Sequence, residues 1–233
     1  MLHCRFGREM EKHMKKPELV IFDMDGVLVN SEGAFRRACS EALEQWGLKP
    51  EYEEFRPFTG MGDILYIGGV SEKHGIPYET EMTDIAYDLY AGYAPTLLHV
   101  FPWSRKVLES LHREGVKIAL ASSAGAYKVD INISCIGVEK DIFSALVTGS
   151  DVENKKPAPD IFLAASGKAG IAPENCLVIE DAISGIQAAH AAGMKVATVT
   201  SSFTRRELED AEADYVCDDI GEFIAGYFDI EVK

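Results

Sequence analysis

The sequence predicts an α/β protein: a doubly wound parallel sheet with a small all-helical domain inserted after the first strand. The apolar run at residues 19–21 is typical of a buried strand, and it ends in Asp23-x-Asp25-Gly26. From residue 32 to about residue 93, apolar residues recur at helical spacing and no strand pattern appears. After residue 101, strand and helix patterns alternate, which indicates parallel βαβ units.

These patterns also predict the domain boundaries. Residues 1–17 form an N-terminal extension, residues 18–30 and 101–233 form the core, and residues 31–100 form the helical cap. The extension is basic but lacks the apolar segment of a secretory signal, so we expect a flexible tail. The core strands after the insertion are expected at 117–121, 145–147, 176–179 and 196–200, and helices at about 104–114, 126–136, 159–168 and 182–192.

Composition narrows the possible partners and the compartment. The 233 residues include 23 basic and 38 acidic side chains, a net charge of −15, which disfavours nucleic acid and anionic membranes as partners. No apolar run approaches the length of a membrane span. The cysteines are odd in number and lack metal-ligand spacing, so we expect reduced thiols and a cytoplasmic location. They are Cys4, Cys39, Cys135, Cys176 and Cys217.

Two carboxylates mark the end of the first predicted strand. Asp23 and Asp25 are two residues apart, so their side chains project from the same face of the chain. Open α/β sheets bind ligands at this carboxyl edge. Two neighbouring carboxylates repel each other and favour a cation, a proton or both between them. A solvated Asp-x-Asp-Gly turn, which is common in proteins, is the alternative interpretation of the motif taken alone.

Three later stretches complete a set of four motifs. They are Ala-Leu-Ala-Ser-Ser at 119–123, Lys-Lys-Pro-Ala-Pro-Asp at 155–160, and Val-Ile-Glu-Asp at 178–181 followed by Ser184-Gly185. With Asp23-x-Asp25, this set resembles that of the haloacid dehalogenase superfamily, and most closely its β-phosphoglucomutase-like phosphatases. The resemblance covers residues 19–30 and 101–215 and implies a Rossmann-like core with a helical cap.

The resemblance implies a role for each motif residue. Asp23 is the expected nucleophile, which forms an aspartyl-phosphate, and Asp25 is the expected general acid and base. Ser122, assisted by Ser123, and Lys156 are expected to hold the oxygens of the transferring phosphoryl group. Without the other motifs, the serines would be read as turn residues and the lysine as a surface residue.

The resemblance also implies a magnesium ion. Its expected ligands are Asp23, the backbone carbonyl of Asp25, Asp181, and Glu180 either directly or through water. Oxygen ligands suit this hard cation. Capping of the following helix is the alternative role for Asp181.

Asp25 and Asp63 bear on the reaction type. In the resembled superfamily, dehalogenases carry a tyrosine and phosphonatases a small residue at the position of Asp25, so an aspartate indicates phosphate esters. The β-phosphoglucomutases offer a basic residue to the distal phosphate from a cap loop. Here that loop, residues 59–63, ends in Asp63, whose charge should repel a second phosphate and so favours hydrolysis.

We therefore predict a magnesium-dependent phosphatase acting on a small phosphorylated metabolite, with a sugar phosphate as the expected class. The protein is expected to be a monomer or a weak homodimer. A sugar phosphomutase of the β-phosphoglucomutase type is the first alternative, and a phosphate-binding module without turnover is the second. A receiver domain would be about half this length and has no helical insertion.

Overall fold

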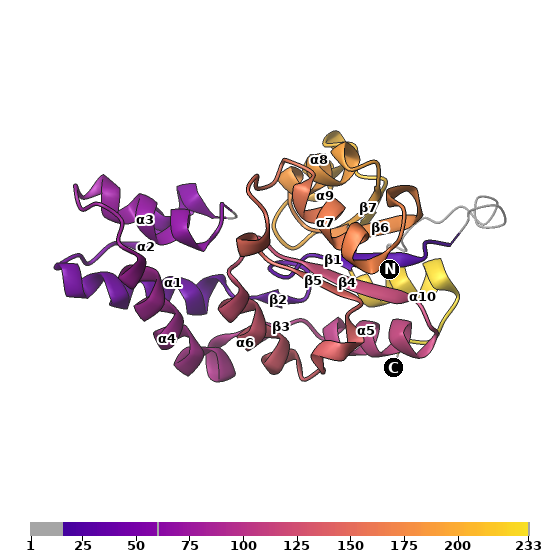
Figure 1. Cartoon of the computed structure of the whole chain (residues 1–233), viewed down its shortest axis with the longest axis horizontal. Helices are drawn as coiled ribbons and strands as arrows, with labels where there is room; N and C mark the ends of the chain where they lie inside the picture. Colours follow the sequence, from indigo (N-terminus) through magenta and orange to yellow (C-terminus); the bar gives the residue numbers. More distant parts are fainter. Residues whose placement is uncertain (1–15, 60, 233) are drawn as a thin grey trace.

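The computed structural model describes residues 16–59 and 61–232, so the N-terminal extension lies almost entirely outside the described residues. A six-stranded sheet with the order β5-β4-β1-β6-β7-β8 forms the centre of the core (Figure 1). All neighbouring strands are parallel, which confirms the predicted fold class. The strands are β1 (Leu19–Phe22), β4 (Lys117–Ala121), β5 (Ala145–Val147), β6 (Cys176–Glu180), β7 (Lys195–Val199) and β8 (Tyr215–Cys217).

β1 lies in the middle of the sheet, where the winding reverses. Leu19 pairs with Lys117 of β4 on one side and with Cys176 of β6 on the other. The chain first builds β4 and β5 on one side of β1 and then crosses to β6, β7 and β8 on the other side. In such sheets the carboxyl ends of the strands at the reversal form a crevice for ligands.

Helices cover both faces of the sheet because β1 is apolar on both sides. Val20 and Phe22 belong to a hydrophobic cluster with residues of α5, α6 and α10, whereas Leu19 and Ile21 belong to a second cluster with residues of α7 and α8. The core helices are α5 (Ser104–Arg113), α6 (Ala126–Ile136), α7 (Asp160–Ala169), α8 (Ile183–Ala191), α9 (Arg205–Asp210) and α10 (Ile220–Phe228). Short 3-10 helices are η3 (Lys140–Ile142), η4 (Gly149–Asp151) and η5 (Pro173–Asn175).

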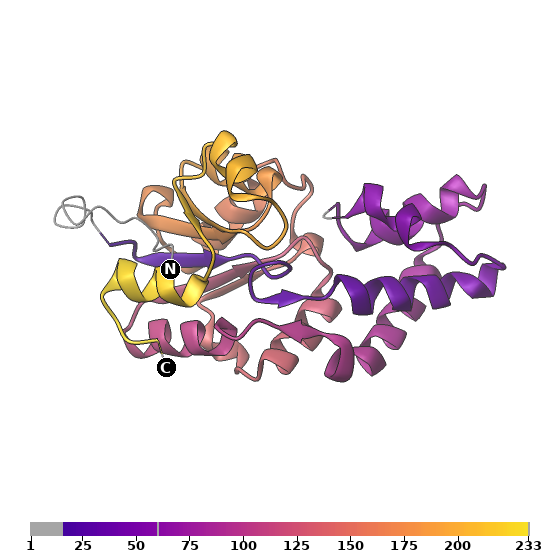
Figure 2. The same cartoon turned by 180° about the vertical axis from the view of Figure 1, so that it is seen from behind.

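The insertion after β1 is helical and lies at one end of the molecule (Figures 1 and 2). We call residues 32–97 the helical block. Its elements are α1 (Glu32–Leu43), η1 (Glu44–Trp46), α2 (Tyr52–Phe55), η2 (Arg56–Phe58), α3 (Asp63–Lys73) and α4 (Thr80–Leu97). The block has its own hydrophobic cluster, and α4 also packs against α6 of the core.

Two short strands flank the helical block, and neither was predicted from the sequence. β2 (Val29–Asn30) and β3 (His99–Val100) pair antiparallel, with Val29 opposite Val100. The two chain segments that connect the core with the helical block therefore form one antiparallel ribbon. β8 was not predicted either, because its three residues carry no distinct strand pattern. No helix in the described ranges combines the length and apolar character that a membrane span requires.

The central position of β1 predicts a large loss of stability when its side chains are shortened. Ile21 is fully buried between β4 and β6. Ile21→Ala should lower the free energy of unfolding by roughly 2–5 kcal/mol, measured by urea denaturation, because it removes buried methyl groups and leaves a cavity. Leu163→Ala on the exposed side of α7 is the control and should change stability by less than about 0.5 kcal/mol. Equal losses in the two variants would contradict this account of the core.

Candidate active site

The predicted site residues other than Lys156 lie at the carboxyl ends of the three central strands or directly after them. Asp23 directly follows β1, Ser122 directly follows β4, and Glu180 ends β6. Backbone bonds extend the sheet pairing to these positions: Asp23 N–H donates to the Ile179 carbonyl (2.9 Å), and Ser122 N–H donates to the Val147 carbonyl (3.0 Å). The sheet therefore positions the motif residues on one edge, at the reversal of its winding.

Lys156 joins two of these carboxylates. Its Nζ lies 2.5 Å from Asp23 Oδ1 and 2.6 Å from Glu180 Oε1, and its side chain is only 6% exposed. The other oxygen of Glu180 accepts the backbone N–H groups of Asp181 (2.7 Å) and Ala182 (2.8 Å). Charge-assisted bonds of this kind fix both side chains. Lys156 therefore presents its charge to Asp23, whereas its neighbour Lys155 is exposed and binds backbone carbonyls.

Burial and neighbouring charges shift the pKa values of the ionisable groups at this edge. Burial raises the pKa of Asp23 to about 7, although Lys156 opposes the shift. Burial also raises the pKa of Asp181, and the neighbouring charges of Glu180 and Asp23 add to the effect. Burial alone would lower the pKa of Lys156, but Asp23 and Glu180 raise it above its usual value. Three buried carboxylates thus lie at an edge where one ammonium group pairs with two of them, and the site favours additional positive charge.

Two glycines leave room for the acidic side chains. Gly26 has φ +80°, and a Cβ there would lie 1.8 Å from Asp181 Oδ2; a Cβ on Gly185 would lie 1.9 Å from Glu180 Oε1. Asp181 also accepts hydrogen bonds from the hydroxyl groups of Ser201 and Ser202. Asp181 is not the cap of the next helix, because Ala182 is the N-cap residue of α8, so the capping alternative is wrong.

The two predicted phosphate-binding serines lie in the turn after β4. Ser122 is buried, and its Oγ accepts the N–H of Ala124 (3.2 Å), so the side chain also stabilises the turn. Ser123 is half-buried beside it. This placement is compatible with phosphate binding and with the turn role that the residue type alone suggests.

Asp25 has a buried partner that the sequence analysis missed. Lys128 of α6 lies with its Nζ 3.2 Å from Asp25 Oδ2 and 3.5 Å from Asp63 Oδ1. The hydroxyl group of Ser31 donates to the other oxygen of Asp25. A lysine in a helix is usually exposed, so Lys128 drew no attention in the sequence. The one signal for its burial was its place beside apolar residues such as Val129.

Asp63 differs from its expected role. Its carboxylate is buried and accepts the Gly125 N–H (2.9 Å) and the Tyr87 hydroxyl (2.8 Å) in addition to its contact with Lys128. Its charge is thus balanced by neighbouring donors, which removes the basis of the argument that it repels a second phosphate. Gly60 of the same loop lies outside the described residues.

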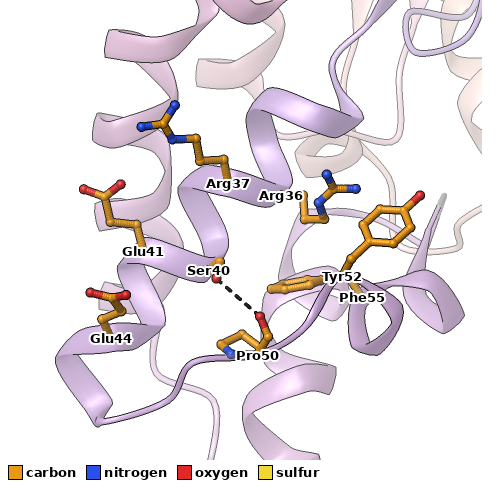
Figure 3. Close-up of a pocket in the computed structure, with 8 residues that line it drawn as sticks. All are labelled: Arg36, Arg37, Ser40, Glu41, Glu44, Pro50, Tyr52 and Phe55. Atoms are coloured by element: carbon orange, nitrogen blue, oxygen red, sulfur yellow. Dashed lines mark hydrogen bonds between the residues drawn. The ribbon is translucent and has the colours of Figure 1, made fainter.

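A pocket in the helical block is lined by none of these carboxylates. It has a volume of about 500 Å³ and lies between α1 and α2 (Figure 3). Arg36 at its wall stacks on Tyr52, with 3.7 Å from the guanidinium carbon to the ring centre. None of the predicted site residues lines it, so we assign it no part in the site.

The acidic side chains do not form a complete metal cage. Residues 16–59 and 61–232 contain no group of three or more His, Cys, Asp and Glu side chains arranged to hold a metal ion. Mg²⁺ usually takes one or two carboxylates and retains several waters, so a closed cage is not required. Asp23 and Asp181 can supply such a partial set of oxygen ligands.

Comparison with known proteins identifies the family. The sequence profile of haloacid dehalogenase-like hydrolases matches residues 20–199, well over half of the chain. The chain belongs to this family. It is 39% identical to the Arabidopsis thaliana protein SUPPRESSOR OF QUENCHING 1, chloroplastic, over 88% of the chain and 20% of that relative. It is 30% identical to the bifunctional riboflavin kinase/FMN phosphatase of the same plant, over 82% of the chain and 51% of the relative.

The chain therefore spans about a fifth and about half of the lengths of these two relatives. A relative of similar length is the phosphorylated carbohydrates phosphatase of Thermotoga maritima, 31% identical over 76% of the chain and 82% of the relative. Among solved structures, a hydrolase from Pseudomonas syringae has a TM-score of 0.73 at 28% identity, covering 91% of the chain and 98% of that protein. β-Phosphoglucomutase from Clostridium difficile shares the fold, with a TM-score of 0.74 at 22% identity over 91% and 97% of the two chains. The predicted superfamily is confirmed. A solved structure from Thermotoga maritima, provisionally described as a β-phosphoglucomutase, with a TM-score of 0.70 at 26% identity over 91% and 98% of the two chains, supports the predicted branch.

The close approach of Gly26 to Asp181 predicts that a side chain at this glycine disturbs the acidic site. Gly26→Ala should lower the free energy of unfolding by about 1–3 kcal/mol more than Gly47→Ala, measured by chemical denaturation. Gly47 is the matched control because it has a similar φ of +74° with nothing within 4 Å of its added Cβ. Both variants bear backbone strain, but only the first displaces a neighbour. Equal losses would refute the contact.

The raised pKa of Asp23 predicts that the protein in EDTA loses stability as the pH rises. The folded state holds the Asp23 proton up to a pH of about 7, whereas a carboxyl group with the ordinary pKa of 3.8 releases it earlier. The stabilising contribution is complete below the ordinary pKa and is lost as the pH rises through the raised one. The free energy of unfolding of Asp23→Asn minus that of wild type should therefore increase by roughly 1–3 kcal/mol between about pH 5 and about pH 8.

Denaturant titrations at several pH values measure this difference. Asp84→Asn, on an exposed position of α4, is the control and should show no comparable change with pH. A constant difference between Asp23→Asn and wild type across this pH range would contradict the prediction.

Proposed function

We propose that this protein is a magnesium-dependent phosphatase that hydrolyses a small phosphorylated metabolite through an aspartyl-phosphate at Asp23. A sugar phosphate is the substrate class we favour. The observation that supports this proposal most directly is the position of the buried Asp23 carboxylate. It lies at the carboxyl end of β1, 2.5 Å from the ammonium group of Lys156. The phosphatase relatives and the membership of the chain in a hydrolase family support the same conclusion.

The reaction proceeds in two displacements. A carboxylate oxygen of Asp23 attacks phosphorus, the bond from phosphorus to the leaving oxygen breaks, and Asp25 gives its proton to the departing alcohol. Water then attacks the aspartyl-phosphate, Asp25 takes a proton from that water, and Asp23 is released with inorganic phosphate. Lys156, with Ser122 and Ser123, stabilises the negative charge on the phosphoryl oxygens.

The residues at this edge fit a magnesium ion because they offer oxygen ligands and an excess of negative charge. Asp23, the backbone carbonyl of Asp25 and Asp181 would hold it, with Glu180 bound directly or through water. When bound, the ion supplies positive charge to the phosphoryl oxygens.

The helical block supports a proposal about domain organisation. Residues 31–100 would act as a cap that covers the site formed by residues 18–30 and 101–233 and excludes water during the reaction. The described cysteines are free thiols. A cytoplasmic location, a monomer or weak homodimer, and the absence of nucleic-acid and membrane partners stay predictions.

Phosphate release from a panel of sugar phosphates, nucleotides and pyrophosphate tests the proposed activity. We expect release with magnesium, loss of release with EDTA, and a fall of at least about 1,000-fold in Asp23→Asn because the nucleophile is removed. Lys156→Met should lower kcat by about 100-fold or more. Lys155→Met is its matched control and should retain activity, because Lys155 is exposed and binds only backbone carbonyls in the structure.

The same assay separates the alternatives. β-Glucose 1-phosphate with a trace of the sugar bisphosphate is run in parallel, and its conversion without phosphate release would establish a phosphomutase. Absence of both reactions in folded wild-type protein would contradict the enzymatic proposal and favour a phosphate-binding module.

A further inference from the structure

The two displacements described above assign no role to Lys128 or Asp63, which form a buried group with Asp25. Three distant segments meet there: Asp25 after β1, Lys128 in α6, and Asp63 at the start of α3. The side chain of Lys128 is 6% exposed, and that of Asp63 is 8% exposed. A buried cation between two carboxylates restricts the positions of all three groups.

The helical block provides most of the surroundings of this cation. The Lys128 Nζ lies 4.3 Å from the ring centre of Phe35 in α1 and 6.0 Å from that of Tyr90 in α4. Asp63 supplies the second carboxylate. Cation–π contacts and the ion pair both weaken if the block moves away from α6, because water then replaces these partners. The position of the Lys128 ammonium group therefore depends on the docked block.

Asp63 is also a direct link between the block and the core. The Gly125 N–H and the Lys128 ammonium group reach its carboxylate from the beginning of α6. The Tyr87 hydroxyl reaches it from α4 of the block. The same carboxylate that holds the block against α6 thus contacts the lysine that contacts Asp25.

We propose that Lys128 is a positioning residue for Asp25, and that Asp63 makes this positioning conditional on the docking of the helical block. The inference rests on the proposed function, because it assumes that Asp25 transfers the proton. Lys128 holds Oδ2 of the carboxylate while Ser31 binds Oδ1. The plane of the carboxylate is thereby fixed only when the block covers the site. Proton transfer to the leaving group is thus linked to closure.

Leaving-group dependence separates positioning of Asp25 from a general structural effect. Phenyl phosphate and p-nitrophenyl phosphate have similar size, but nitrophenolate departs readily without a proton, whereas phenolate benefits from one. Lys128→Met should lower kcat/KM for phenyl phosphate by roughly 10–100-fold and for p-nitrophenyl phosphate by less than about 3-fold. Asp63→Asn should cause the same selective loss, and the double variant should lose little more than Lys128→Met, because both act through one contact.

Matched variants keep the test decisive. Lys140→Met removes an exposed ion pair with Asp130 (2.6 Å), which lies in α6 as Lys128 does. This variant should leave both rates unchanged. Lys128→Arg retains the charge and should recover part of the loss for phenyl phosphate. If Lys128→Met does not fold, Asp63→Asn decides the result. Equal losses for the two substrates, no loss, or a faster reaction would each overturn the inference.

The outcome is distinguishable from failure of the proposed function. If wild type releases no phosphate, or Asp23→Asn still releases it, the proposed function fails. If wild type is active, Asp23→Asn is inactive, and the folded Lys128 and Asp63 variants show no selective loss, then only the inference about positioning fails.

Discussion

This edge of the sheet depends on one constraint: three carboxylates are buried there, and the ammonium group of Lys156 pairs with two of them. A buried charge without a partner is strongly destabilising, so each carboxylate needs donors. Glu180 meets this need with Lys156 and two backbone N–H groups, and Asp181 with serine hydroxyls. The close packing leaves no space for a side chain at Gly26 or Gly185. Local backbone geometry and charge balance are therefore linked at this edge.

The second buried lysine extends the same principle to the helical block. Lys156 connects Asp23 with Glu180 inside the core, whereas Lys128 connects Asp25 of the core with Asp63 of the block. The two carboxylates of the Asp-x-Asp motif are thus held by different cations. The pair of Asp23 and Lys156 is held within the core, whereas the pair of Asp25 and Lys128 lies where the helical block packs against α6. A shared motif can in this way combine a fixed group with one that responds to closure.

The sequence predicted the sheet and its edge because those features are local. The apolar runs mark the strands, and the motif residues follow them directly, so Asp23, Ser122 and Glu180 could be placed on one edge before any contact was known. The partners of Lys128 and Asp63 could not be predicted in this way. Their contacts join residues 24 to 103 positions apart, which come together only when the segment after β1 and the helices α3, α4 and α6 are assembled. The β2–β3 ribbon was missed for the same reason, since two-residue strands carry no pattern.

Charge balance gives an independent reason to expect a cation at the site. Asp23, Asp25, Asp63, Glu180 and Asp181 carry five potential negative charges, and Lys128 and Lys156 already bind four of these groups. A phosphate ester entering such surroundings would add negative charge to an existing excess, in a protein whose net charge is −15. Both lysines already pair with two carboxylates each, so their charges do not remove this excess. A divalent cation beside Asp23 and Asp181 would offset the excess negative charge and attract the phosphate.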